Sequence, residues 1–325
     1  MAILQPSGIS SGAAPHPRAP KALAPSAAAE SRAALSRRER GGIRRPFLSL
    51  PWRAYLPLAP ALLFLIVFLL LPLGATVWLS LSPNVLIKFD APGLANFAYL
   101  LGKPYYLDVL WRTLRLAAMT TVVALLVGYP AAWFLRDLSA RAASTLIIAL
   151  TFPILAGPLV VVLGWMILLS DGGPLFGPLV RHGLIGHVRL LGSEAAVVVG
   201  QVHFTLPFVV LTLYAALKQI PADTLEAARS LGAGRIQVLR HVVWPLSLPG
   251  VLSACLIAFS LAASSYVSPH YLGGAATLTL TTLIAQFITA TYNSQLASAA
   301  AVMLLIVMAV IVFGFTKATS RAVRI

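Results

Sequence analysis

Six long apolar runs constrain the fold of this chain more than any other feature of its sequence. About 20 apolar residues are needed for a helix to cross the roughly 30 Å hydrocarbon core of a membrane. One such run can be a buried helix of a large soluble protein, but six of them, with only 10% charged residues, predict an all-α polytopic membrane protein with six transmembrane helices. The predicted spans are residues 58–81, 113–135 (with an uncharged core at Leu116–Leu135), 145–169, 195–217, 246–268 and 294–316.

Residues 1–50 differ in composition from everything that follows. They are rich in Ala, Ser, Pro and Arg and show no hydrophobic period. Such a segment buries too little apolar area to offset the entropy lost on ordering, so we expect a disordered, basic cytoplasmic tail. The scarcity of acidic residues is also typical of a transit peptide, and the sequence leaves that alternative open.

Lysine and arginine are distributed unevenly between the segments that separate the six runs. If the N-terminus is cytoplasmic, most of the 24 basic residues fall on the cytoplasmic side. The positive-inside rule favours this orientation, which places both termini and residues 218–245 in the cytoplasm. Topology thus accounts for the net charge of +15, and we expect no nucleic-acid partner because no groove-reading motif is present. The expected surroundings are membrane lipid.

Motifs of catalysis and of metal or nucleotide binding are missing from the sequence. It contains no G-x-x-x-x-G-K-[ST], HExxH or CxxC pattern, and its one cysteine, Cys255, lies within an apolar run. We therefore expect no catalytic residues, no metal site and no ATP bound by this chain itself.

A polar segment, "EAARSLGAGRIQVLRHVVWP", stands between the fourth and fifth apolar runs. Its pattern predicts two short helices separated by Gly232, which suits a left-handed stop. Asp223 and Glu226 favour the positive end of the first helix. Apolar residues recur at helical spacing in both halves, which fits either a hairpin on the membrane surface or a docking surface for another protein.

This segment resembles the cytoplasmic EAA loop of ABC-importer permeases. The matching positions are Glu226-Ala227-Ala228, Gly232 and Val242–Pro245, with Trp244 where the family pattern has Leu. The resemblance implies that residues 218–245 form the loop that seats in the ATPase subunits. The residues it assigns to ATPase coupling are Asp223, Glu226, Ala227, Ala228, Gly232 and Pro245. Stabilising the helix N-terminus is an alternative role for Glu226.

Further passages resemble the spermidine/putrescine-type permeases. They are "LVGYPAAWFL", "HFTLPFVVLTLYAAL" and "YVSPHYLGG", and the similarity covers roughly residues 55–318. It implies a type I permease domain in the bacterial inner membrane. The implied partners are two ATP-binding subunits, a second permease subunit and a periplasmic binding protein that delivers substrate. A polyamine is the implied solute, while phosphonate, iron, thiamine and opine-like compounds remain open.

Polar residues inside the predicted spans are candidates for the substrate pathway, because polar groups at membrane depth are costly. His203 also fits a structural hydrogen bond, and Ser or Thr in a span often bonds to its own helix. The candidates are Trp165, Gln201, His203, Ser264, Ser265 and Tyr266, with Gln286 nearby.

Two other classes of protein compete with the importer. A secondary transporter predicts ionisable residues at mid-membrane and an inverted repeat, and the sequence shows neither clearly. A membrane scaffold without a transport role leaves the spacing of the EAA pattern unexplained.

Overall fold

The computed structural model describes residues 58–88, 92–170, 172–174, 177–178, 182, 190–274 and 277–322, with side chains as far as 317. The predicted tail at residues 1–50 lies outside them. The chain divides into two units, Met1–Ile66 and Val67–Ile325. In the first unit the structure describes helix α2 (Ala59–Leu65), which has no buried residue. A π-helical turn, η2 (Ile66–Leu70), begins at the end of this unit and continues the helix.

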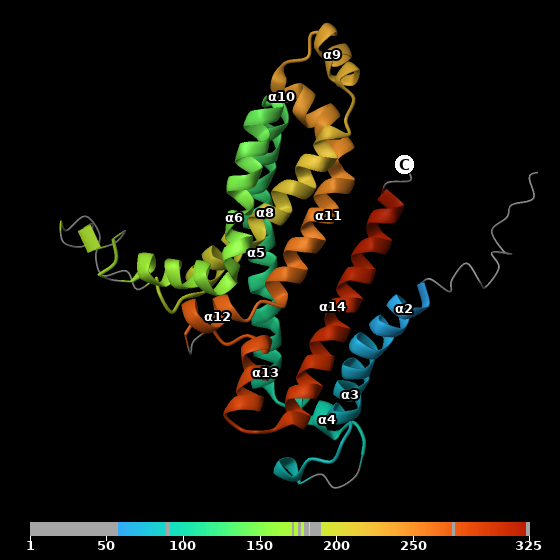
Figure 1. The fold of residues 1–325 in the computed structure, drawn as a ribbon, viewed down its shortest axis with the longest axis vertical. Coiled ribbons are helices and arrows are strands. Elements are labelled where there is room, and N and C mark those ends of the chain that lie inside the picture. Colours follow the sequence, from blue (N-terminus) through green and yellow to red (C-terminus); the bar gives the residue numbers. More distant parts are fainter. Residues whose placement is uncertain are drawn as a thin grey trace, which may run out of the picture. The chain divides into compact units, whose positions relative to one another are not determined.

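The regular elements in the described part of the second unit are helices. Its elements are α3 (Leu71–Ser80), η3 (Val85–Ile87), α4 (Ala95–Leu101), α5 (Pro104–Asp137), α6 (Ala140–Leu169), α8 (Glu194–Lys218), α9 (Ala222–Ser230), α10 (Arg235–Val238), η4 (Leu239–Val243), α11 (Trp244–Ala263), α12 (Val267–Leu272), α13 (Leu280–Thr289) and α14 (Ser294–Ala322). In Figure 1, α9 and α10 lie at one end of the α5, α8 and α11 group, and α13 lies toward the other end.

Six helices in the described residues are long and apolar enough to cross a membrane, which confirms the predicted fold class. They are Ala59–Ser80, Pro104–Asp137, Ala140–Leu169, Glu194–Lys218, Arg235–Ala263 and Ser294–Lys317. The second begins at Pro104, before the start expected at residue 113. The fifth ends at Ala263, because the chain turns there into the separate short helix α12, whereas the sequence predicts a span as far as residue 268.

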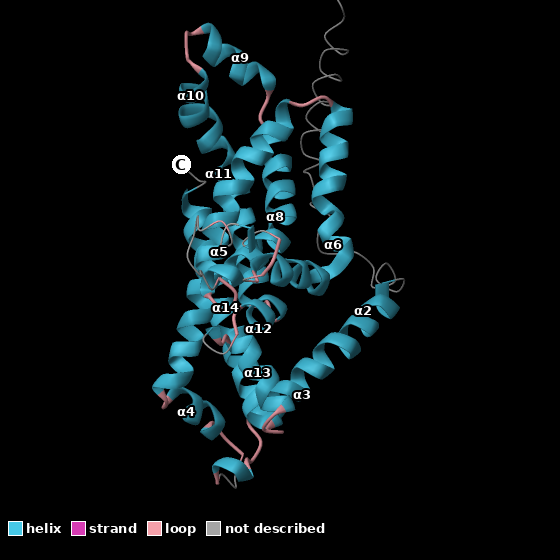
Figure 2. Ribbon diagram, turned by 90° about the vertical axis from the view of Figure 1, so that its left-hand side faces the viewer, coloured by secondary structure: helices cyan, strands magenta, loops and turns pink. Residues whose placement is uncertain are grey.

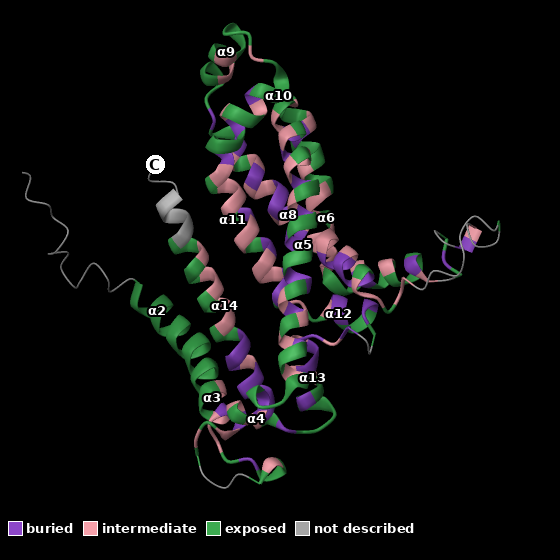
Figure 3. Cartoon of the chain, turned by 180° about the vertical axis from the view of Figure 1, so that it is seen from behind, coloured by how far each residue is buried: buried purple, intermediate pink, exposed green. Residues whose placement is uncertain are grey.

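Helices α5, α8 and α11 pack directly against one another and hold the largest group of buried apolar residues. Two glycines allow the close approach. A Cβ added to Gly128 of α5 would lie 2.7 Å from Cγ1 of Val209 on α8, and one added to Gly250 of α11 would overlap the Cβ of Ala216 on α8. Small residues at helix contacts are the usual means of packing within a membrane. Figure 3 shows the buried residues along α8 accordingly.

At the end of the bundle opposite α9, three buried asparagines join distant parts of the chain. Asn84 donates its Nδ2 to Oδ1 of Asn96 at 2.9 Å and to Oδ1 of Asn293 at 3.0 Å. Asn293 also accepts from the backbone N–H of Leu296, which caps α14. Because buried amides are costly without partners, this network fixes the loop after α3 to the start of α4 and of α14.

Nearby, an ion-pair cluster joins α5 to the N-terminus of α8. Arg115 pairs with Glu194, and Nε of Arg112 lies 3.9 Å from the same carboxylate.

The contact at Gly250 gives the first prediction. Gly250→Ala forces α8 and α11 apart, because the new methyl group meets the Cβ of Ala216, which is fixed to its backbone. Overpacking of this kind costs about 1–3 kcal/mol. We expect the thermal midpoint of the detergent-solubilised protein to fall by roughly 2–10 °C. Gly164→Ala is the control, because nothing lies within 4 Å of its added Cβ. Equal midpoints for the two variants would contradict the assigned contact.

Candidate functional site

Helix α9 carries the first half of the predicted coupling loop. Pro221 precedes it as the N-cap, and Asp223 lies in its first turn, where a carboxylate is favoured by the helix dipole. Leu225 and Ala228 pack against the buried apolar group that includes Val238 of α10 and Val243 of η4, the two elements that α9 contacts. The remaining candidates on this helix, Glu226 and Ala227, are exposed. The helix therefore has one face held against α10 and η4 and one face free.

Gly232 ends this helix in the left-handed conformation that its position suggested, with φ of 85°. The backbone N–H of Gly232 donates to the carbonyl of Arg229, and that of Ala233 donates to the carbonyl of Ala228. These two bonds satisfy carbonyls that the helix end leaves open. An L-residue with a side chain is strained at such a φ, so glycine is required by the turn.

The second half of the loop differs from the sequence expectation of a short, separate helix. α10, η4 and α11 form one continuous helix, Arg235–Ala263, which enters the bundle without a break. Pro245 is the second residue of α11 and follows η4 closely, so the N–H that it lacks falls where the helix changes from π-helical to α-helical geometry. Trp244, which departs from the family pattern, packs its ring against Tyr129 of α5 at a centroid distance of 5.3 Å.

The surface at the tip of the loop is apolar at two points and acidic at one end. Leu231 is 90% exposed and Ile236 is 80% exposed. Among the described residues, Asp223 and Glu226 form no ion pair. These two large apolar side chains stand in water on either side of the turn at Gly232, on the same loop as the two carboxylates. We call the residues Asp223, Glu226, Leu231 and Ile236 the loop tip.

Arg136 anchors the base of the loop. Its Nη2 donates to the carbonyl of Ile220 at 3.3 Å, at the point where α8 gives way to the loop, and its guanidinium lies 5.3 Å from the ring centroid of Trp133. The interaction ties the end of α5 to the end of α8, so both helices support the loop.

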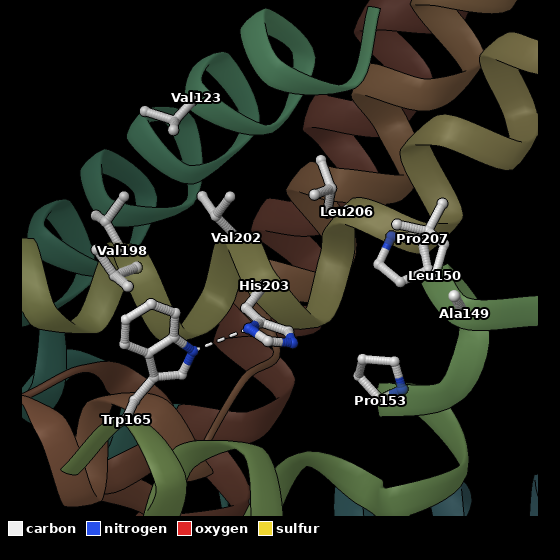
Figure 4. A pocket seen from close by; sticks show the side chains of 11 residues that line it. Val123, Ala149, Leu150, Pro153, Trp165, Val198, Val202, His203, Leu206 and Pro207 are labelled. Atoms are coloured by element: carbon white, nitrogen blue, oxygen red, sulfur yellow. Dashed lines mark hydrogen bonds between the residues drawn. The ribbon is translucent and has the colours of Figure 1, made fainter. Parts of the chain in front are cut away.

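A second candidate region lies where α6 faces α8 (Figure 4). Trp165 donates its Nε1 to Nδ1 of His203 at 3.0 Å, and both side chains line an apolar cavity of about 420 Å³. Gly157 brings Trp165 to this place, because its φ of 78° and ψ of 158° break α6 into two segments. The change of direction is visible in Figure 2. The structural hydrogen bond considered for His203 is thus present.

Gln201 is 3% exposed and joins three helices. Its Oε1 accepts from Oγ1 of Thr120 on α5 at 2.7 Å, and its Nε2 donates to the carbonyl of Ala262 on α11 at 3.1 Å. These bonds occupy both ends of the amide. The geometry gives Gln201 a role in holding the bundle together at the wall of a cavity.

The other candidates gather at that cavity, which has a volume of about 220 Å³ and lies between α8, α11 and α12. Gln201, Ser264, Ser265 and Tyr266 line it. The hydroxyl of Ser264 donates to the carbonyl of Ser260 at 2.8 Å, the bond within its own helix that is common for serine in a span. The six candidates therefore fall in two places, with Trp165 and His203 at the first cavity and the other four at the second.

Comparison with known proteins places these features in a family. Residues 121–325 match the model of the binding-protein-dependent transport system inner membrane component. The chain belongs to this family.

Relatives and solved structures extend the match. The permease is 31% identical over 216 residues to the spermidine/putrescine transport system permease protein PotB of Haemophilus influenzae, covering 66% of this chain and 76% of that protein. It is 34% identical over 192 residues to PotB of Escherichia coli, covering 59% and 70%. A bacterial alginate ABC transporter in complex with a pentasaccharide-bound periplasmic protein shares the fold, with a TM-score of 0.70, 17% identity, and 83% and 95% coverage.

The structure also brings together polar residues of the permease, of which the sequence had singled out only Gln286. His270 and Gln286 line a further cavity of about 280 Å³ beside α12 and α13, and Tyr271 lies exposed next to His270. The passage "YVSPHYLGG" contains His270 and Tyr271, but the exposure of both side chains follows only from the short helix α12. In the described residues, no group of three or more His, Cys, Asp or Glu side chains is placed to hold a metal ion.

The bonds of Gln201 give the second prediction. Thr120→Val removes the hydroxyl and leaves Oε1 of Gln201 buried without its donor, which costs about 1–3 kcal/mol. We expect a thermal midpoint lower by several degrees in detergent, while Thr120→Ser keeps the donor and most of the stability. If Thr120→Val is no less stable than Thr120→Ser, the hydrogen bond between Thr120 and Gln201 does not stabilise the bundle.

Proposed function

We propose that this chain is a permease subunit of an ATP-driven importer for polyamines such as spermidine and putrescine. The observation that carries the proposal is the loop tip, an exposed surface on a loop whose other face packs against the start of the helix that enters the bundle. A protein that only anchors other proteins in the membrane does not need a loop that continues without a break into a helix of the bundle.

The importer takes its energy from partner subunits. Two ATP-binding subunits receive the loop tips of two permease subunits, and a periplasmic binding protein delivers the solute at the opposite end. In this arrangement the N- and C-termini and the loop are cytoplasmic and the chain lies in the bacterial inner membrane. The permease itself holds no cofactor. A second permease chain, related to this one, completes the pathway.

Polyamine is the proposed solute because the PotB relatives carry that name and share at least 31% identity with this chain. The sn-glycerol-3-phosphate permease UgpA of Escherichia coli is 31% identical over 216 residues and covers 63% of this chain. An anionic solute is therefore the second candidate.

A substrate panel tests the solute. We expect proteoliposomes that contain the complete importer and its binding protein to accumulate labelled spermidine or putrescine. This uptake requires ATP on the side of the membrane where the ATPase subunits lie. Uptake of neither, with ATP-dependent uptake of glycerol-3-phosphate, phosphonate, ferric iron, thiamine or an opine, would replace the polyamine. Uptake driven by an ion gradient without ATP would replace the importer with a secondary transporter.

Variants of the loop tip test the coupling. We expect Glu226→Ala to reduce ATP-driven uptake about tenfold or more, because a hydrogen bond to a charged group contributes about 1.5–3 kcal/mol. Gly232→Pro removes the left-handed turn and disturbs the seating of α9 in the same assay. The measurements are uptake, ATPase activity and co-purification of the ATPase subunit.

Asp137→Ala is the matched control, because Asp137 is an exposed carboxylate at the end of α5, outside the loop tip. Full uptake and full ATPase association in both loop variants would overturn the coupling role.

A further inference from the structure

Helix α12 presents an aromatic face to the outside of this subunit. Tyr266 and His270 stack with a centroid distance of 5.0 Å and an interplanar angle of 20°. His270 meets Tyr271 edge to face at 4.8 Å and 89°. All three side chains are exposed. We call Tyr266, His270 and Tyr271 the aromatic face of α12.

The opposite side of α12 is fixed to the bundle. Leu272 is fully buried against α8, and the carbonyl of Leu272 accepts from the backbone N–H of Gly192 at 2.8 Å. Gly200 of α8 has no room for a Cβ, because Cδ1 of Leu272 and Oγ of Ser268 occupy the space. The three rings are therefore carried on a short helix that cannot shift easily, which keeps their orientation defined.

The aromatic face contributes one ring to each of two cavities whose linings also include polar side chains. Tyr266 belongs to the cavity of about 220 Å³ that also contains Ser264 and Ser265. His270 belongs to the cavity of about 280 Å³ that contains Thr282 and Gln286. Hydroxyl and amide groups thus lie on both sides of the rings.

The charge of this part of the chain selects among solutes. From Pro245 to Thr316 the sequence contains no Lys, Arg, Asp or Glu. An anion finds no cationic partner within this segment, and Arg112 and Arg115 of the neighbouring α5 are paired with Glu194 at the start of α8. A cation finds no carboxylate, but the negative faces of aromatic rings attract ammonium groups, by an energy that rises when water is excluded. Hydroxyl and amide oxygens accept the remaining N–H donors.

We propose that the aromatic face of α12 recognises the alkylammonium groups of the imported solute and is a determinant of its specificity in the pathway. The inference rests on the proposed function, since it assigns this role to a polyamine importer. A neutral solute also stacks on aromatic rings, so the test depends on charge and not on stacking alone.

Position 270 separates the two effects. His270→Lys places a fixed positive charge on the aromatic face, while His270→Met gives a neutral side chain of similar length. Like charges about 5 Å apart repel strongly at a partly solvated site. In proteoliposomes with the complete importer, we expect the maximal rate of spermidine uptake to be at least about tenfold lower for His270→Lys than for His270→Met.

The concentration for half-maximal uptake is expected to remain unchanged, because the binding protein sets it.

The tyrosines test the rings themselves. Tyr271→Leu removes the aromatic ring, and Tyr271→Phe keeps it. We expect about a three- to tenfold lower maximal rate for the Leu variant than for the Phe variant. Tyr292→Leu, which changes an exposed tyrosine outside the aromatic face, is the control and keeps the wild-type rate. Equal ATPase activity and equal assembly of all variants show that the complex is intact.

The outcomes separate the inference from the proposed function. If the unmodified importer takes up spermidine and the Lys and Met variants at position 270 are equally active, the inference is overturned and the proposed function stands. Indistinguishable Leu and Phe variants at position 271 overturn it as well. If the unmodified importer takes up only an anionic or uncharged solute, the proposed polyamine function fails, and the role assigned to the aromatic face fails with it.

Discussion

The close contact between α5, α8 and α11 is the interaction on which the other features of the second unit depend. Lipid tails are as apolar as the side chains they would replace, so burial of apolar area gives little drive for helices to associate in a membrane. Gly128 and Gly250 supply the alternative, because they let backbones approach until dispersion contacts are dense. Gln201 adds directional interactions, since its amide forms hydrogen bonds to a hydroxyl on α5 and a carbonyl on α11.

Two less regular elements pack against this bundle. The break at Gly157 turns the second segment of α6 so that Trp165 meets His203. The turn after Ala263 produces α12, which is held by Leu272 and exposes its rings on the other side. Non-helical backbone at membrane depth is tolerated where protein surrounds it or where it lines a cavity. Both breaks lie beside cavities, so the irregular backbone occurs where the candidate pathway residues gather.

The length of the apolar runs was enough to predict the number of spans and the helical class, because crossing a hydrocarbon core fixes both. The pattern of residues in the loop between the fourth and fifth spans also predicted the left-handed turn at Gly232. The run lengths could not predict that Arg235–Ala263 is one helix, since the polar residues after Gly234 read as a separate surface helix. Nor could they pair Trp165 with His203 or join Asn84 to Asn293, because those contacts depend on packing between segments distant in the sequence. The residue roles at the loop tip and in the pathway stay predictions.

The continuous helix Arg235–Ala263 connects the two regions that the proposals concern. At 1.5 Å per residue it is about 40 Å long, comparable to a membrane with its head groups. Ile236 of the loop tip lies near its start, and Tyr266 of the aromatic face follows its end by a few residues. A straight helix transmits displacement along its length, but η4 places a π-helical turn between the loop tip and the bundle. Trp244, immediately after this turn, is fixed against Tyr129. In the proposed coupling, a force at the loop tip would act first on this π-helical segment, and then on a helix that packs against α5 and α8 and ends just before α12.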